Sequence, residues 1–252
     1  MKTLIVVPSR LGSTRFPAKV LALLDGKPLV RWCWEAAKAA SAGEVLIATE
    51  AAEVVKAVEA FGGKAVLTSA KCQSGTDRVH EAAKGRDADL IINVQGDMPF
   101  VKPDTIKAVI DLLAKDASVD IATAVAPLTD AKRIADPNVV KAVLAAPAGD
   151  FRRAAEISRC LYFSRSPIPY PRDPAAARYW EHIGIYGYRK ASLQRFVALP
   201  PSPLELTESL EQLRALEAGM IISAAVVSES PVAIDTAADL LRAESLLTGR
   251  KK

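Results

Sequence analysis

The sequence predicts an α/β fold in which a mostly parallel β-sheet is flanked by helices. Short apolar, β-branched segments alternate with helix-like segments through the first half of the chain, which is the pattern of consecutive βαβ units. A length of 252 residues, half of them hydrophobic, is enough for a substantial core. We therefore expect one domain that covers residues 1–252.

In the first half of the chain, glycine and proline mark the ends of the expected elements. Pro28 suits the first turn of a helix, and Gly62-Gly63 is a typical helix stop. The segment 89–94 is apolar throughout, as in a strand buried on both faces. We expect strands at 4–7, 44–49, 65–68 and 89–94, and helices after Gly26-Lys27-Pro28, at 52–61 and at 76–84.

The second half continues with a helix at 106–113 and a strand at 120–126. Short β-branched or aromatic pieces and many prolines between 135 and 174 then indicate a mixed, partly antiparallel region. A further helix follows Ser202, which can form a capping box with Glu205. We expect Leu206, Leu210 and Leu213 to form one apolar face of that helix, followed by strands at 221–227 and 232–234 and a helix from about Thr236.

Charge and cysteine content exclude several classes of protein. The net charge of +4 comes from 33 basic and 29 acidic residues, a balance that does not indicate a nucleic-acid partner. The three cysteines form no CxxC pair, so neither a disulfide framework nor a zinc site is expected. The longest uncharged apolar segment, 218–228, is far shorter than the ~20 residues that span a bilayer. We expect a soluble cytoplasmic protein with no membrane partner.

A basic loop follows the first expected strand. The apolar run 4–7 breaks at Pro8, and Arg10, Arg15 and Lys19 follow among small residues. Guanidinium groups and backbone N–H groups can share the oxygens of a polyphosphate. The chain contains neither GxxxxGK[ST] nor GxGxxG, so a P-loop or an ordinary dinucleotide site is not expected. Taken alone, the loop fits a solvated surface as well as a phosphate site.

Two acidic residues, Asp97 and Asp235, follow expected strands. Ligands of parallel sheets bind beyond the carboxyl ends of the strands, and Mg²⁺ needs only one or two protein carboxylates beside substrate oxygens. The pair therefore suits a magnesium site next to a nucleotide. A turn aspartate at Asp97 and a helix cap at Asp235 are the structural alternatives.

Taken together, these residues and several later motifs resemble the 3-deoxy-manno-octulosonate cytidylyltransferase (CMP-Kdo synthetase) family over nearly the whole chain. The motifs are PSR with STRFPAK (8–10, 13–19), GKP (26–28), QSGTDR (73–78), NVQGD (93–97), LYFSR (161–165), HIGIYGYR (182–189), PLE (203–205), LEQLR (210–214) and DT (235–236). The later motifs are the more specific, because the basic loop alone would suit several sugar nucleotidyltransferases.

The resemblance implies a Rossmann-like sheet of the nucleotide-diphospho-sugar transferase type. It also implies a small mixed β region for sugar binding and dimerisation at about 135–200. The implied reaction joins CTP and Kdo to give CMP-Kdo and pyrophosphate, with Mg²⁺, in a homodimer that supplies lipopolysaccharide synthesis.

Family roles fall on three groups of residues. Nucleotide binding is implied for Pro8, Arg10, Arg15, Lys19, Gln73, Ser74, Gly75 and Arg78, and metal binding for Asp97 and Asp235. Contact with the sugar acid is implied for Gln95, Arg165, His182, Tyr186, Glu211 and Gln212. Arg10, Arg15, Lys19, Asp97 and Asp235 are the implied catalytic set, with no side chain assigned as an obligatory base.

Some of these roles have structural alternatives. His182 can be a structural hydrogen-bonding residue, Arg165 a surface or dimer contact, and Tyr186 a packing residue, while Glu211 and Gln212 can belong to a solvated helix face.

The chain departs from the family pattern at Met98, where a glutamate usually follows the Gly-Asp pair. The stretch 150–159 looks longer than usual and the loop 173–182 shorter. These departures leave open another acidic sugar as the acceptor of the reaction, such as 8-amino-Kdo or a nonulosonic acid. A nucleotide-binding regulator without turnover is the alternative outside enzymes. The motifs do not choose CTP over UTP by pocket shape.

Overall fold

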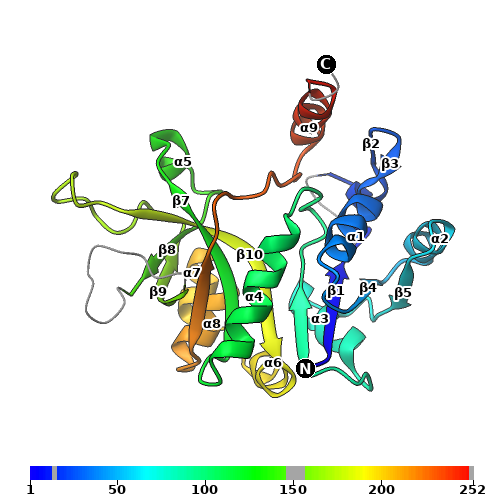
Figure 1. Ribbon diagram of the computed structural model, residues 1–252, viewed down its shortest axis with the longest axis horizontal. Helices are drawn as coiled ribbons and strands as arrows, with labels where there is room; N and C mark the ends of the chain where they lie inside the picture. The colour runs from blue at the N-terminus through cyan, green and yellow to red at the C-terminus, as the bar shows by residue number, and fades with distance from the viewer. Residues whose placement is uncertain (13–15, 146–156, 250–252) are drawn as a thin grey trace. The chain divides into compact units, whose positions relative to one another are not determined.

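The computed structural model describes residues 1–12, 16–145 and 157–249, and the chain divides into two compact units (Figure 1). The first unit contains residues 1–107 and 231–252, and the second contains residues 108–230. The chain passes from the first unit to the second within α4 (Pro103–Lys115). The predicted single domain with a subregion at about 135–200 stays a prediction.

The first unit is built on four parallel strands. Their order is β5 (Lys64–Leu67), β4 (Glu44–Thr49), β1 (Thr3–Pro8) and β6 (Leu90–Asn93). Ile5 of β1 pairs with Val45 on one side and with Ile92 on the other. Residues 4–7 and all of β6 are buried, which explains why both segments are apolar without alternation. The four predicted strands are confirmed to within one residue at each end.

Helices α1 (Leu29–Ala39), α2 (Ala52–Ala60), α3 (Gly75–Ala83) and α9 (Ala237–Gly249) complete the first unit with the short 3₁₀ helix η1 (Lys19–Leu21). The predicted stop of α2 is confirmed, because Gly62 has a φ of 79° and the Gly63 N–H bonds the Val58 carbonyl. Pro28 is the N-cap of α1 and not a residue of its first turn, because it first pairs in the hairpin of β2 (Leu23–Leu24) and β3 (Lys27–Pro28).

Among its described residues, the second unit has five strands that pair in a mixed arrangement. Their order is β10 (Tyr179–Arg189), β7 (Ile121–Leu128), β11 (Ile222–Val226), β9 (Ile157–Ser164) and β8 (Lys141–Leu144). Among the strand pairings described in this unit, that of β11 with β7 is parallel and the others are antiparallel. Trp180 of β10 pairs with both Pro127 of β7 and Ala142 of β8. The antiparallel region predicted between 135 and 174 is therefore confirmed for its described residues.

Helices α5 (Ala131–Ala135), α6 (Lys190–Ala198), α7 (Pro203–Glu208) and α8 (Gln212–Glu217) belong to the second unit. The Ser202–Glu205 capping box is present. The predicted single apolar face is wrong, because Ser209 takes a left-handed conformation (φ 51°) that separates α7 from α8. Leu206 is consequently 69% exposed, whereas Leu210 and Leu213 are buried.

Within its described residues, the chain has no helix long and apolar enough to cross a membrane.

Candidate active site

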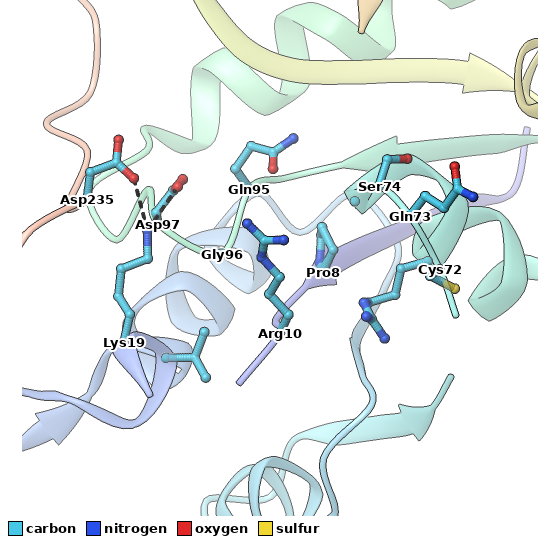
Figure 2. A pocket seen from close by; sticks show the side chains of 13 residues that line it. Pro8, Arg10, Lys19, Cys72, Gln73, Ser74, Gln95, Gly96, Asp97 and Asp235 are labelled. Atoms are coloured by element: carbon cyan, nitrogen blue, oxygen red, sulfur yellow. Dashed lines mark hydrogen bonds and ion pairs between the residues drawn. The ribbon is translucent and has the colours of Figure 1, made fainter. Parts of the chain in front are cut away.

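A pocket of about 370 Å³ opens in the first unit beyond the carboxyl ends of its parallel strands (Figure 2). Its lining contains every described residue that was predicted to bind nucleotide or metal. These residues are Pro8, Arg10, Lys19, Gln73, Ser74, Gly75, Arg78, Asp97 and Asp235, and Val20, Cys72, Gln95 and Gly96 complete the lining. The predicted residue Arg15 lies outside the described residues.

The ends of β1 and β6 form the floor of the pocket. The Ser9 N–H donates to the Ala48 carbonyl at 2.8 Å, which continues the pairing of β1 with β4. Gly96, just after β6, lies against the backbone of Pro8, and a Cβ added to Gly96 would be 2.6 Å from the Pro8 oxygen. Only glycine fits this approach without a shift of the backbone. The close packing places Asp97 beside the loop that carries Arg10.

Asp97 and Asp235 converge on one cation, the Lys19 ammonium (Figure 2). Lys19 Nζ lies 3.2 Å from Asp97 Oδ2 and 3.1 Å from Asp235 Oδ1. Burial raises the pKa of Asp97, the positive charge of Lys19 opposes that rise, and the negative charge of Asp235 adds to it. Two carboxylates at this distance from a common point require a positive charge between them.

The position of Asp235 corrects one prediction. Residues 232–234 were expected to be a strand, but they pair with no strand. A backbone bond from the Ile234 N–H to the Asp97 carbonyl at 2.9 Å ties the segment to the loop after β6. Asp239 Oδ2 accepts hydrogen bonds from the N–H groups of Asp235 and Thr236 at the start of α9. These contacts hold Asp235 beside Asp97 without a strand ladder.

The donor set of this pair fits a magnesium ion. Both ligands are carboxylates, both reach one cation-occupied point, and Mg²⁺ completes its shell with substrate oxygens and water. Within the described ranges, no cluster of three or more His, Cys, Asp or Glu side chains could hold a metal. The pair would therefore bind magnesium with the rest of its shell supplied by water or by oxygens of a ligand such as a triphosphate.

The N-terminus of α3 forms another wall of the pocket. Ser74 Oγ accepts a hydrogen bond from the Asp77 N–H, and Asp77 Oδ2 accepts one from the Ser74 N–H, which is a complete capping box. This arrangement leaves the Ser74 hydroxyl proton free to donate elsewhere. Gln73, directly before the cap, is exposed beside it.

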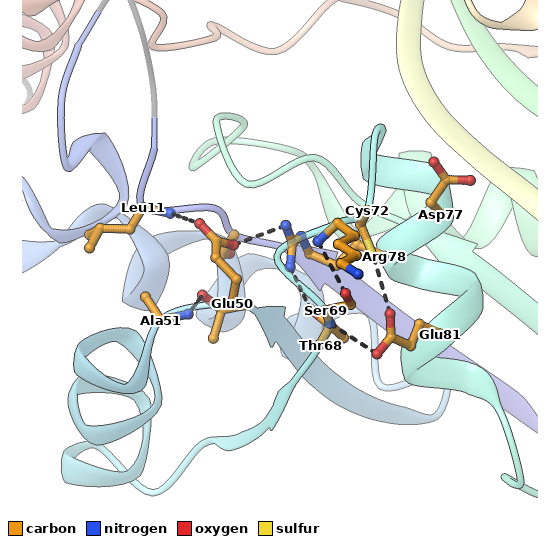
Figure 3. A network of polar contacts seen from close by, with 12 residues as sticks. Leu11, Glu50, Ala51, Thr68, Ser69, Cys72, Asp77, Arg78 and Glu81 are labelled. Carbon is orange, nitrogen blue, oxygen red and sulfur yellow. Dashed lines mark hydrogen bonds and ion pairs between the residues drawn. The ribbon is translucent and has the colours of Figure 1, made fainter.

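Arg78 is a buried residue of this wall and belongs to a polar network that sequence reasoning missed (Figure 3). Its Nη2 lies 3.0 Å from Glu50 Oε2, and its Nη1 donates to Thr68 Oγ1 at 2.5 Å. Glu50 follows β4 and reads in the sequence as an ordinary acidic residue before a helix. Its place beyond the end of a parallel strand is the one signal that could have found it.

Five predicted sugar residues, Arg165, His182, Tyr186, Glu211 and Gln212, belong to the second unit, whereas Gln95 belongs to the first. Arg165 is held by backbone carbonyls: Nε donates to Glu208 O at 2.7 Å, Nη1 to Pro137 O at 2.9 Å and Nη2 to Ser209 O at 3.2 Å. Gln212 is buried, and its Nε2 has no hydrogen-bond partner among the described residues. The expectation of a solvated face is therefore wrong for Gln212.

His182 is held as a neutral imidazole. Burial lowers its pKa to about 3. Its Nε2 lies 3.0 Å from Thr123 Oγ1, and this hydroxyl also lies within hydrogen-bond distance of the carbonyls of Ile183 and Ile185 at the β10 bulge. Because the hydroxyl must donate to a carbonyl, Nε2 carries the proton and donates to the hydroxyl.

His182 and Tyr186 lie in one aromatic group, with ring centroids 5.5 Å apart. Burial raises the pKa of Tyr186, and the negative charge of Glu211 adds to the rise. The two side chains therefore remain neutral at ordinary pH and can act only through neutral hydrogen bonds.

The chain belongs to the cytidylyltransferase family, whose model matches residues 4–222. It is 53% identical to the 3-deoxy-manno-octulosonate cytidylyltransferase of Elusimicrobium minutum over 249 residues, which are 97% of this chain and 98% of that protein. It is 47% identical to the enzyme of the same name from Methylobacterium radiotolerans over 252 residues, at 98% coverage of both chains. Within the family, the chain therefore belongs with the 3-deoxy-manno-octulosonate cytidylyltransferases, and the resemblance stated from the sequence is confirmed.

Solved structures agree with this placement. The fold matches that of a CMP:2-keto-3-deoxy-manno-octonic acid synthetase complexed with CTP, with a TM-score of 0.91, 39% identity and coverage of 99% of this chain and 100% of that chain. A cytidylyltransferase from Leptospira borgpetersenii shares the fold alone, with a TM-score of 0.61, 15% identity and coverage of 100% of this chain and 95% of that one. The predicted α/β nucleotidyltransferase fold is confirmed at this level.

Proposed function

We propose that this protein transfers CMP from CTP to the anomeric hydroxyl of 3-deoxy-D-manno-octulosonate, giving CMP-Kdo and pyrophosphate. The observation that carries the proposal is the convergence of Arg10, Lys19, Asp97 and Asp235 on one pocket in a chain about half identical to enzymes named for this reaction. The solved relative that is complexed with CTP supports the choice of nucleotide.

The chemistry of the pocket suits an attack on the α-phosphorus. A hydroxyl displaces pyrophosphate in line, so the site must position the groups and neutralise charge more than it must supply a covalent catalyst. Arg10 is exposed at the pocket, and its guanidinium has no ion-pair partner in the described part of the chain, so it is available to phosphate oxygens. Once another cation neutralises Asp97 and Asp235, the Lys19 ammonium can bind the departing pyrophosphate instead of these two carboxylates. Arg15, which lies outside the described residues, is proposed for the same role from the resemblance alone.

Asp97 and Asp235 would hold magnesium with oxygens from the bound substrates. When bound, the ion would neutralise phosphate charge and acidify the attacking hydroxyl. Replacing Asp97 with Asn should reduce turnover severely and leave the fold intact, as judged by circular dichroism. Near-normal activity of that variant at ordinary magnesium concentrations would show that the metal assignment is wrong.

For the sugar acid we propose Gln95 in the first unit and Arg165, His182, Tyr186, Glu211 and Gln212 in the second. The unpartnered amide of buried Gln212 supports this, because a buried donor without an acceptor is costly unless a ligand supplies one. His182 would act as a neutral hydrogen-bond donor or acceptor and not as a cation. A homodimer, a Rossmann-like sheet with a dimerisation region at about 135–200, a cytoplasmic location and a role in lipopolysaccharide synthesis are proposed from the same family likeness.

Met98 was one of the three departures from the family pattern that left another acidic sugar open as the acceptor. Its backbone forms turn bonds, with its N–H donating to Gln95 O and its carbonyl accepting from the Val101 N–H, each at 3.3 Å. These bonds do not need a carboxylate side chain. The names of the relatives favour Kdo over a nonulosonic acid and over a regulator without turnover.

A product assay tests the proposal. The protein, CTP and Mg²⁺ are incubated with Kdo, 8-amino-Kdo or a nonulosonic acid, and pyrophosphate and the CMP-sugar are quantified, with UTP replacing CTP in parallel. We expect release of pyrophosphate with CTP and Kdo. No release with Kdo would overturn the proposal, and release with another acid would reassign the acceptor.

A further inference from the structure

Glu50 lies behind the pocket wall, directly after β4, and both of its carboxylate oxygens are engaged (Figure 3). Oε1 accepts a hydrogen bond from the Leu11 N–H at 2.9 Å. Oε2 lies 3.0 Å from Arg78 Nη2, which makes an ion pair without hydrogen-bond geometry. One side chain therefore connects the loop after β1 with helix α3.

The bond to Leu11 fixes the part of the loop that carries Arg10. The backbone is tied on one side of Arg10 by the bond from the Ser9 N–H to the Ala48 carbonyl at 2.8 Å. Glu50 ties it on the other side through Leu11. Since Arg10 is exposed at the pocket, these two bonds set the direction in which its side chain leaves the backbone. Without Glu50, the Leu11 N–H loses its acceptor, and on that side of Arg10 the bond from the Ala18 N–H to the Leu11 carbonyl at 3.2 Å remains.

The ion pair with Arg78 balances a buried charge. The side chain of Arg78 is 6% exposed and that of Glu50 is 20% exposed. Arg78 also donates to Thr68 Oγ1, which belongs to the loop after β5. A guanidinium in this position is costly without a counter-charge. Glu50 supplies that charge and so keeps Arg78 in the wall of the pocket.

We propose that Glu50 is a positioning residue for the nucleotide, which acts through Arg10 and Arg78 and does not touch the substrate itself. The inference rests on the proposed function, because it takes CTP as the ligand of this pocket. Loss of the Glu50 carboxylate should weaken CTP binding roughly 10- to 100-fold, since the Leu11 N–H beside Arg10 loses its acceptor and Arg78 loses its counter-charge. The KM for the sugar acid should change by less than about twofold.

Two variants separate the contacts. Glu50→Ala removes both, whereas Glu50→Gln keeps one oxygen acceptor and loses the charge, so its defect should be intermediate. Glu53→Ala is the matched control, because Glu53 is an exposed carboxylate on the first turn of α2 and does not line the pocket. Titration calorimetry with CTP and Mg²⁺ but no acceptor gives the dissociation constant, and steady-state kinetics give kcat and both KM values.

We expect CTP binding to weaken in the order wild type, Glu50→Gln, Glu50→Ala, with Glu53→Ala equal to wild type. Unchanged CTP binding by Glu50→Ala would overturn the inference while the wild type still turns over. So would a fall in kcat with both KM values unchanged. If Glu50→Ala does not fold, wild-type CTP affinity in the folded Glu50→Gln variant would overturn it. A wild type that binds no CTP would instead overturn the proposed function, and this inference with it.

Discussion

Replacing Lys19 with Ala tests how the two pocket carboxylates are balanced. The lysine Nζ lies 3.2 Å from Asp97 Oδ2 and 3.1 Å from Asp235 Oδ1, and the Lys19 side chain is 11% exposed. In the variant, both carboxylates face the pocket without their shared cation. We therefore expect a loss of stability that added magnesium reduces, because the ion can replace the missing charge. We also expect a loss of catalytic rate that added magnesium does not restore.

The size of the stability loss in Lys19→Ala follows from the solvent exposure of the two aspartate partners. The Asp235 side chain is 43% exposed, so solvent screens its pair, whereas Asp97 at 30% is better shielded. Each such pair contributes at most about 1 kcal/mol. The free energy of unfolding should therefore fall by about 1–2 kcal/mol in magnesium-free buffer. The rate should fall on the order of 10²–10³ if Lys19 neutralises transition-state charge.

Urea unfolding in EDTA, repeated with increasing Mg²⁺, measures the first effect. Steady-state kinetics at saturating CTP measure the second. Lys64→Ala is the control, because Lys64 is 72% exposed and pairs only at the surface with Glu44. Its free energy of unfolding should change by less than about 0.5 kcal/mol.

Two results would refute this reasoning. A Lys19→Ala variant as stable as wild type in EDTA would show that the two ion pairs contribute nothing to the fold. A higher KM for CTP with an unchanged kcat would show that Lys19 only binds the nucleotide.

Three further predictions concern other positions. Gly96→Ala should lower the free energy of unfolding by about 1–3 kcal/mol in urea titrations, because the added Cβ meets the Pro8 carbonyl at 2.6 Å. Cys72 should react slowly with iodoacetamide at pH 7.5 in mass-spectrometric time courses, because burial and the hydrogen bond to Glu81 raise its pKa to about 11; Glu81→Gln should accelerate the reaction. The pKa of His182 falls from 6.5 to about 3 in the folded state through burial, so the unfolded chain binds more protons between these values. Stability should therefore decline as pH falls through this range, and less steeply in a His182→Asn variant by urea unfolding.

Each of these has a clear contrary outcome. Wild-type stability of Gly96→Ala would mean that the backbone moves aside without cost. Equal alkylation rates with and without Glu81 would exclude its control of the Cys72 thiol. Identical pH profiles for wild type and His182→Asn would show that the histidine is not buried in its neutral form.

Local signals in the sequence predicted most elements because their causes are local. The uninterrupted apolar run at 4–7 and the glycine stop at Gly62 needed no knowledge of distant residues. The end of α7 at Ser209 was missed, because nothing in its neighbours requires a left-handed residue. Because the helix ends there, Leu210 and Leu213 are buried while Leu206 stays exposed to solvent. This difference is set by the tertiary packing of the chain.

The sequence by itself determined the α/β class through the alternation of its elements. The resemblance of its motifs supplied the family and most of the described residues that line the pocket. The tertiary structure alone decided which charges meet. It brought Asp235 to Lys19 through a backbone bond between Ile234 and Asp97 in place of a strand, and it paired Glu50 with buried Arg78. Such pairs join residues far apart in the chain, and their energy depends on burial and distance, which no local pattern encodes.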